Sequence, residues 1–145
     1  MDQMTLLELI KDRFEVGEVD INTYSPLTLA FIGDCIFDLV IRTVVVGRAN
    51  RSPNKLHKEK ADIVKAPTQS EMAKALSDVF TPEEQDIYRR GRNAHSYSTA
   101  KNASVGDYRR ATGLEAVMGY LYLTGDDARC IELIKTGLDR LGIEI

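Results

Sequence analysis

Two carboxylates stand one helical turn apart in a stretch of the sequence that is otherwise almost entirely apolar. Asp34 and Asp38 lie within residues 26–42, where leucine, isoleucine, valine and phenylalanine are frequent. A carboxylate in such surroundings is costly unless a cation, a hydrogen-bonding network or a metal compensates its charge. Gly33, beside Asp34, removes a side chain where another backbone or a ligand could approach closely. The alternative is a core helix whose acidic edge touches solvent, and this stretch alone leaves both open.

A third isolated acid, Glu115, lies in a second apolar stretch over residues 108–123. Gly113 and Gly119 permit close approach of another helix, each at about 1 kcal/mol of helix propensity. If the two stretches pack together, Asp34 and Glu115 can reach one hard cation, because Mg²⁺ takes oxygen ligands and needs one or two carboxylates beside its waters. The alternative is an ion pair between Glu115 and an arginine. The candidates are Arg42, Arg109 and Arg110.

The apolar spacing that must position these acids is helical along nearly the whole chain. One helix should open at Pro26, since Ser25 can cap it and proline suits the first helical position. Another should open after Thr81, where Glu84 completes a capping box. Pro67 should end or kink a helix. The predicted helices cover residues 4–14, 26–46, 56–66, 68–79, 82–91, 107–124 and 126–142.

These helices predict an all-α fold of six or seven helices in a single domain, residues 1–145. The 26–46 helix carries apolar side chains on all sides, which is typical of a buried helix. Cys35 and Cys130 lie among apolar neighbours and are expected in the core as reduced thiols. With only these two cysteines and the widely spaced His57 and His95, no zinc motif can be written.

The composition describes an ordinary globular protein, with 43% hydrophobic and 28% charged residues and a net charge of −3. The charge is uneven, because residues 89–110 form a basic segment that contains Asp107 as its one acid. Its cations are Arg89, Arg90, Arg92, Lys101, Arg109 and Arg110. The N-terminal residues show no secretory leader, and no apolar run could span a bilayer. A cytoplasmic location without membrane contact is expected.

Several motifs resemble one known family, in order and at its intervals. Phe31-Ile-Gly-Asp34 resembles the signature helix of the ribonuclease III catalytic domain, and the run from Glu115 to Leu123 resembles its second acidic helix. The Mini-III branch of that family is the closer match. Four further segments resemble sequence motifs of that branch: Leu56-His-Lys58, Arg90-Gly-Arg-Asn-Ala94, Lys101-Asn102 and Tyr108-Arg-x-x-Thr112-x-x-Glu115. The resemblance covers residues 25–123.

The resemblance implies a homodimer that cuts double-stranded RNA with magnesium and leaves 5′-phosphate and 3′-hydroxyl ends. Asp34 and Glu115 fall on the family's two central metal-binding carboxylates. Ala30 and Thr112 stand where full-length ribonuclease III enzymes have a glutamate and an aspartate, which puts a fully protein-caged two-metal site in doubt and favours the Mini-III branch. The chain leaves no room for a double-stranded RNA-binding domain, so specificity is expected to come from the catalytic domain.

Further residues are expected to support this site. Asp38 and Thr112 are candidates to orient the metal's ligands from outside, although an Asp38 that is solvated or paired with Arg42 is the favoured alternative. Phosphate contacts should dominate RNA binding, because A-form RNA hides its base edges in a deep groove. The candidate RNA-binding residues are His57, Lys58, Arg90, Arg92, Asn93, Ser96 and Lys101.

The family resemblance also implies a substrate, the precursor of large-subunit (23S) ribosomal RNA. A large-subunit ribosomal protein or the pre-ribosome is the corresponding partner. The competing hypothesis is a non-catalytic RNA-binding or ribosome-assembly module that keeps the helical fold. Retention of both Asp34 and Glu115 favours the enzyme, since a binding module has no need for two acids in apolar helices.

Overall fold

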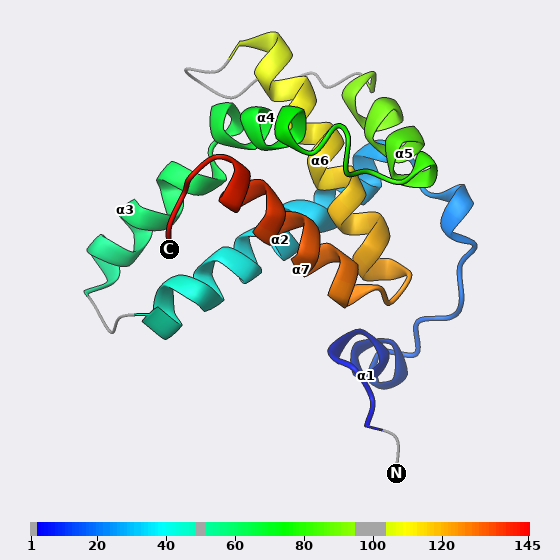
Figure 1. Cartoon of the computed structure of the whole chain (residues 1–145). Helices are drawn as coiled ribbons and strands as arrows, with labels where there is room; N and C mark the ends of the chain where they lie inside the picture. The colour runs from blue at the N-terminus through cyan, green and yellow to red at the C-terminus, as the bar shows by residue number, and fades with distance from the viewer. Residues whose placement is uncertain (1–2, 49–51, 95–103) are drawn as a thin grey trace.

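The computed structural model describes residues 3–48, 52–94 and 104–145. These residues form seven α-helices and one 3₁₀ turn, with no strand among them, which confirms the predicted all-α fold (Figure 1). The elements are α1 (Leu6–Arg13), η1 (Ile21–Thr23), α2 (Pro26–Arg48), α3 (Pro53–Val64), α4 (Ala66–Ala75), α5 (Pro82–Arg92), α6 (Val105–Leu123) and α7 (Asp127–Arg140).

Helix α6 is the centre of the domain, and α2, α4, α5 and α7 pack around it (Figure 1). Its side chains are buried on nearly every side, including Leu114, Val117 and Met118, which are fully buried. At the crossing with α2, glycines bring the two backbones into contact. A Cβ on Gly33 would overlap the carbonyl oxygen of Glu115, and one on Gly119 would overlap that of Leu29. The glycines therefore set the close approach that the sequence predicts.

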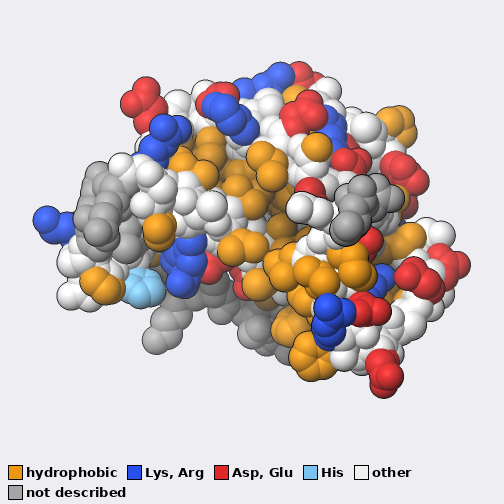
Figure 2. Space-filling view, turned by 90° about the horizontal axis from the view of Figure 1, so that it is seen from below, with side chains coloured by type: hydrophobic (Ala, Val, Ile, Leu, Met, Phe, Trp, Pro, Cys, Tyr) orange, Lys and Arg blue, Asp and Glu red, His pale blue; other side chains and the backbone are white. Residues whose placement is uncertain are grey.

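The expectation that α2 is buried on all sides is wrong. Leu29, Phe37 and Ile41 enter the core, but the opposite side of the helix is open to solvent. We call this open side the outer face of α2; it carries Leu27, Phe31, Leu39 and Val46, and Phe31 is 82% exposed. Hydrophobic side chains also gather across the centre of the surface seen from below (Figure 2). The described part of the chain supplies no element to cover the outer face.

The two cysteines also differ in their exposure to solvent. Cys130 is buried as predicted, but Cys35 is exposed, so its assignment to the core is wrong. Apolar neighbours in sequence do not place a residue in the core when its side of the helix lacks a packing partner.

Several helix boundaries also differ from those expected. Pro67 lies in the first turn of α4 rather than before it, because proline is tolerated where no backbone donor is needed. Helix α4 ends at Ala75, earlier than predicted. The capping box of Thr81 and Glu84 is present as predicted. Helix α6 starts at Val105, where the Ser104 hydroxyl accepts a hydrogen bond from the backbone N–H of Asp107.

Helix α1 lies apart from the main body and buries none of its residues (Figure 1). Thr5 and Glu8 form a capping box at its start, so local hydrogen bonds rather than packing hold its first turn. No helix within the described ranges is both long enough and apolar enough to cross a membrane.

Candidate active site

Asp34 of α2 and Glu115 of α6 meet at the point where the two helices cross. The contact of Gly33 with the Glu115 backbone brings the two side chains together, and their carboxyl groups share a hydrogen bond. Asp34 is exposed, whereas Glu115 is partly buried beneath it. The predicted pairing of the two isolated acids is therefore present in the structure.

The electrostatics of this pair are unusual for carboxylic acids. Burial of Glu115, together with its hydrogen bond to Asp34 and the charge on Asp34, raises the pKa of Glu115 to about 9. At neutral pH Glu115 therefore keeps its proton and donates a hydrogen bond to Asp34. A cation bound between the two carboxyl groups could replace this proton, because it would offset the negative charges of both groups.

The pair lies in an open hollow of about 570 Å³ between α2 and α6. Ala30 and Thr112 line it together with Tyr108 and Asp38. The Thr112 hydroxyl donates a hydrogen bond to the Tyr108 carbonyl at 3.0 Å, so it is anchored to its own helix. Ala30 presents only a methyl group. The hollow thus offers two carboxyl groups and leaves space above them for water and substrate oxygens.

The donor set fits a magnesium ion held by few protein ligands. Within residues 3–48, 52–94 and 104–145, no three acidic, histidine or cysteine side chains gather closely enough to form a complete metal cage. Magnesium, however, keeps several waters and is commonly held by one or two carboxylates plus phosphate oxygens. The pair of Asp34 and Glu115 meets that requirement.

The alternative pairing of Glu115 with an arginine is wrong, because its partner is Asp34. Arg42 donates from Nε to Asp38 at 2.9 Å, while Arg110 donates to the Ser70 hydroxyl at 2.6 Å and to Asp107 at 3.3 Å. Arg42 and Arg110 are thus engaged by other acceptors, and Arg109 is exposed and does not act on Glu115.

Asp38 lines the same hollow but faces cations rather than the other acids. One of its oxygens accepts the hydrogen bond from Arg42, and the other lies 3.4 Å from the Lys60 ammonium of α3. The Arg42-paired alternative for Asp38 is therefore confirmed. No sequence pattern indicates this role of Lys60, because its contact with Asp38 depends on how α3 packs against α2.

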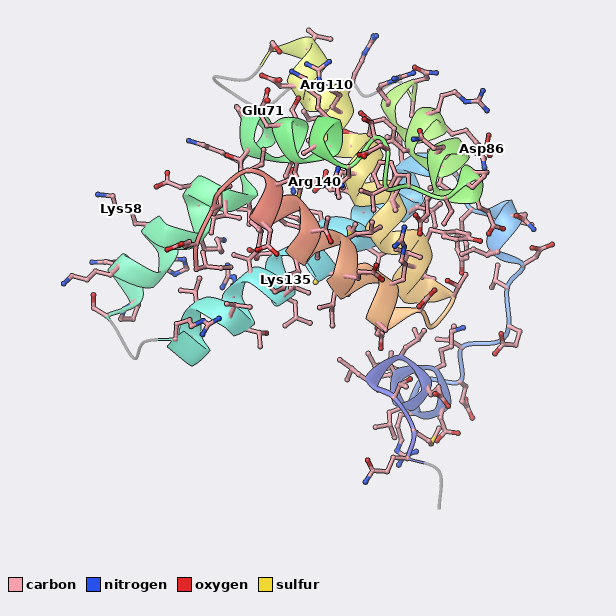
Figure 3. All side chains as sticks on the ribbon, viewed as in Figure 1. Lys58, Glu71, Asp86, Arg110, Lys135 and Arg140 are labelled. Carbon is pink, nitrogen blue, oxygen red and sulfur yellow. The ribbon has the colours of Figure 1, made fainter. Side chains whose placement is uncertain are left out.

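The candidate RNA-binding residues fall into two groups on opposite sides of α6. His57 and Lys58 are exposed on α3, and Lys58 points outward at the edge of the molecule (Figure 3). Arg90, Arg92 and Asn93 are exposed at the end of α5, where the Arg92 guanidinium lies 5.7 Å from the centre of the Tyr88 ring. The structure does not bring the two groups together. Ser96 and Lys101 lie outside the described residues.

Comparisons with known proteins agree with this all-helical domain. A family model described as Ribonuclease III domain matches residues 27–126. Mini-ribonuclease 3 of Thermoanaerobacter sp. is 49% identical over 77% of this chain and 78% of its own length. Mini-ribonuclease 3 of Enterococcus faecalis is 40% identical over 85% of this chain and 95% of its own. A crystal structure of a Fusobacterium nucleatum protein superposes with a TM-score of 0.74 at 30% identity, covering 81% and 94% of the two chains.

The class that these matches define is an all-helical ribonuclease domain. The chain belongs to the ribonuclease III family, within its Mini-ribonuclease 3 branch, and is an endoribonuclease. The hypothesis of a non-catalytic module has no support from relatives that are themselves named ribonucleases.

Proposed function

We propose that this endoribonuclease cuts double-stranded RNA with magnesium held by Asp34 and Glu115, and that it leaves 5′-phosphate and 3′-hydroxyl ends. The observation that carries the proposal is the carboxyl pair itself, because Asp34 and a half-buried Glu115 lie together in the hollow between α2 and α6. Two ionised carboxylates would be unfavourable at this crossing unless a cation compensated their charge.

The bound metal would supply an activated water and offset the negative charge that develops on the phosphate. Glu115 must lose its proton for this, and its burial beneath Asp34 fixes the orientation of the resulting carboxylate. Asp34, exposed at the hollow, supplies the second oxygen ligand and faces the RNA. Ala30 leaves room beside them for a phosphate oxygen. Thr112, tied to the Tyr108 carbonyl, keeps its hydroxyl oxygen beside the pair and can accept a hydrogen bond from a water there.

The proposal includes a homodimer. The outer face of α2 carries large apolar side chains that the described chain leaves open, among them Phe31 and Leu39. Contiguous exposed apolar surface of this kind is typical of a protein interface. A second copy placed against α2 would cover it and would sit beside the hollow, because Leu27 and Phe31 line both.

We further propose that the substrate is structured ribosomal precursor RNA, with the 23S precursor as the specific case, processed in the cytoplasm. A large-subunit ribosomal protein or the pre-ribosome would present the RNA. Support comes from the family resemblance and from the Mini-ribonuclease 3 relatives. The exposed cations of α3 and α5 supply phosphate contacts that read shape rather than sequence.

The test is cleavage of a double-stranded RNA by the purified protein, in magnesium and in EDTA. Asp34→Asn and Glu115→Gln should each slow cleavage by a factor on the order of a thousand, since each weakens several kcal/mol of charge stabilisation. Asp139→Asn, at an exposed pair with Lys135 on α7, is the matched control and should cleave normally. Cleavage that persists in EDTA, or in both carboxylate variants, would refute the metal site.

A further inference from the structure

A second, smaller hollow of about 130 Å³ lies where α2 meets α3. Its polar side chains are all capable of donating to an anion, and they come from two helices. Its lining residues are Arg42, Val45, Val46, Pro53, His57 and Lys60. Among the side chains that the structure describes, no acidic one lines it. Its size and its donors suit a compact oxyanion such as a phosphate group.

Asp38 connects this hollow to the carboxylate hollow. It receives the Arg42 Nε–H and lies near the Lys60 ammonium, so it fixes both cations from the side of the carboxylate hollow. No other described acceptor binds the two terminal nitrogens of Arg42, which are thus free to donate. The side chain of Lys60 is only 17% exposed. One carboxylate opposes two permanent cations, and the cluster keeps a net positive charge.

The spacing along α2 separates this cluster from the cleavage chemistry. Asp34, Asp38 and Arg42 follow one another at successive helical turns, and the Asp38 carboxylate, which holds the Arg42 guanidinium, lies between Asp34 and the cluster. The two hollows share no lining residue. An anion at the cluster must therefore be a different phosphate from the one that is cut.

We propose that Arg42, Lys60 and His57 form a subsite for a second backbone phosphate of the RNA, with Asp38 as the group that orients Arg42. This inference rests on the proposed function, since it assumes that RNA lies across the carboxylate hollow. A guanidinium with two free terminal nitrogens matches a phosphate in a two-pronged hydrogen bond. His57 and Lys60, three residues apart on one side of α3, approach from the opposite side.

The test is the binding of a double-stranded RNA in EDTA, followed by fluorescence anisotropy across a range of salt concentrations. Arg42→Met and Lys60→Met should each weaken binding about tenfold and lower the slope of log affinity against log salt by about one. Lys135→Met is the matched control, because Lys135 is an exposed cation of α7 that is paired with Asp139 and does not line this hollow. An unchanged slope in both test variants would overturn the subsite.

Asp38→Asn should change RNA affinity in the opposite direction, which misfolding of the variant could not explain. Asparagine can still accept from Arg42 Nε, but the competing negative charge is gone, so RNA binding should tighten several-fold. Weaker binding of Asp38→Asn would overturn the subsite, because asparagine keeps the acceptor that orients Arg42 and removes only a negative charge that repels the RNA. A wild type that binds with the expected slope but fails to cleave in magnesium would refute the proposed function and leave the subsite standing.

Discussion

Gly33 of α2 lies directly against the backbone of Glu115 in α6, and this contact sets the separation of the helices that carry the two acids. A Cβ at residue 33 would overlap the Glu115 carbonyl oxygen and come within 2.8 Å of the Gly119 nitrogen. Backbone atoms cannot rotate out of the way, so the helices would have to separate. The glycine is thus a condition for the carboxyl pair.

Gly33→Ala should therefore lower the free energy of unfolding by about 3 kcal/mol, at the upper end of overpacking effects. Gly47→Ala is the matched control in the same helix, because nothing lies within 4 Å of its added Cβ. That control should gain up to about 1 kcal/mol from helix propensity. Urea unfolding of both variants measures the difference, and equal stabilities would contradict the close crossing.

The raised pKa of Glu115 predicts how stability without metal depends on pH. The folded protein holds this proton up to about pH 9, whereas the ordinary value for the unfolded chain is 4.5. Because the folded state binds the proton more tightly, the free energy of unfolding should fall as pH rises between these values. The loss should be complete above about pH 9.

Urea midpoints measured in EDTA at increasing pH test this dependence. Glu115→Gln should lack this part of the decline, since its amide does not titrate. Magnesium should counteract the decline in the wild type, because the cation replaces the proton between Asp34 and Glu115. The same pH dependence in the wild type and in Glu115→Gln would show that this pair is not its source.

The buried ion pair between Glu84 and Arg129 fixes α5 to α7. Arg129 donates from Nε at 2.9 Å and from Nη2 at 2.8 Å, and Glu84 is 4% exposed. Burial alone would raise the pKa of Glu84, but hydrogen bonds from Arg129 and Thr81 outweigh it and hold the pKa below its ordinary value. This stabilisation is present above the ordinary pKa and is lost as pH falls through the lowered one.

Glu84→Gln should destabilise the fold by about 3 kcal/mol, because it leaves a half-buried guanidinium with only the exposed Glu132 as its counter-charge. Asp78→Asn, at an exposed pair with Arg140, should change stability by no more than about 1 kcal/mol. Thermal and urea unfolding of the two variants provide the comparison. A small effect at Glu84 would mean that Arg129 finds a sufficient acceptor in the Val79 carbonyl, to which it also donates.

The outer face of α2 predicts a dimer that a single charge should disrupt. Phe31→Asp should weaken association by at least about a hundredfold, since it replaces a large apolar side chain on each copy. Val105→Asp alters another exposed apolar residue, on α6, and should leave association unchanged. Sedimentation at a series of concentrations distinguishes these outcomes. A monomeric wild type would refute the dimer.

The sequence pattern was sufficient for the fold class, whereas the family resemblance was needed to favour the pairing of Asp34 with Glu115 over an ion pair between Glu115 and an arginine. Helical spacing is a strong local signal, and an isolated acid beside a glycine in each of two apolar helices indicates where those helices must meet. The capping box at Thr81 was predictable for the same reason, since its hydrogen bonds are local.

The predictions that were wrong or missing share a different cause. The exposure of Phe31 and Cys35 depends on which side of α2 finds a partner, and an apolar pattern on all sides does not reveal that. The contact of Lys60 with Asp38 depends on the path of the chain between α2 and α3. Such relationships are tertiary, and no spacing within a single helix encodes them.

The exposed Cys35 has a practical consequence for the carboxylate hollow that it lines. Burial, together with the nearby charges of Asp127 and Asp126, raises the pKa of the Cys130 thiol to about 11. The sequence has no third cysteine. A thiol-reactive fluorophore should therefore react at Cys35 rather than at Cys130. Cys35 lies one helical turn from both Phe31 and Leu39, so a second copy on the outer face of α2 should slow that reaction. The unaltered protein thus carries its own reporter of whether that face is covered.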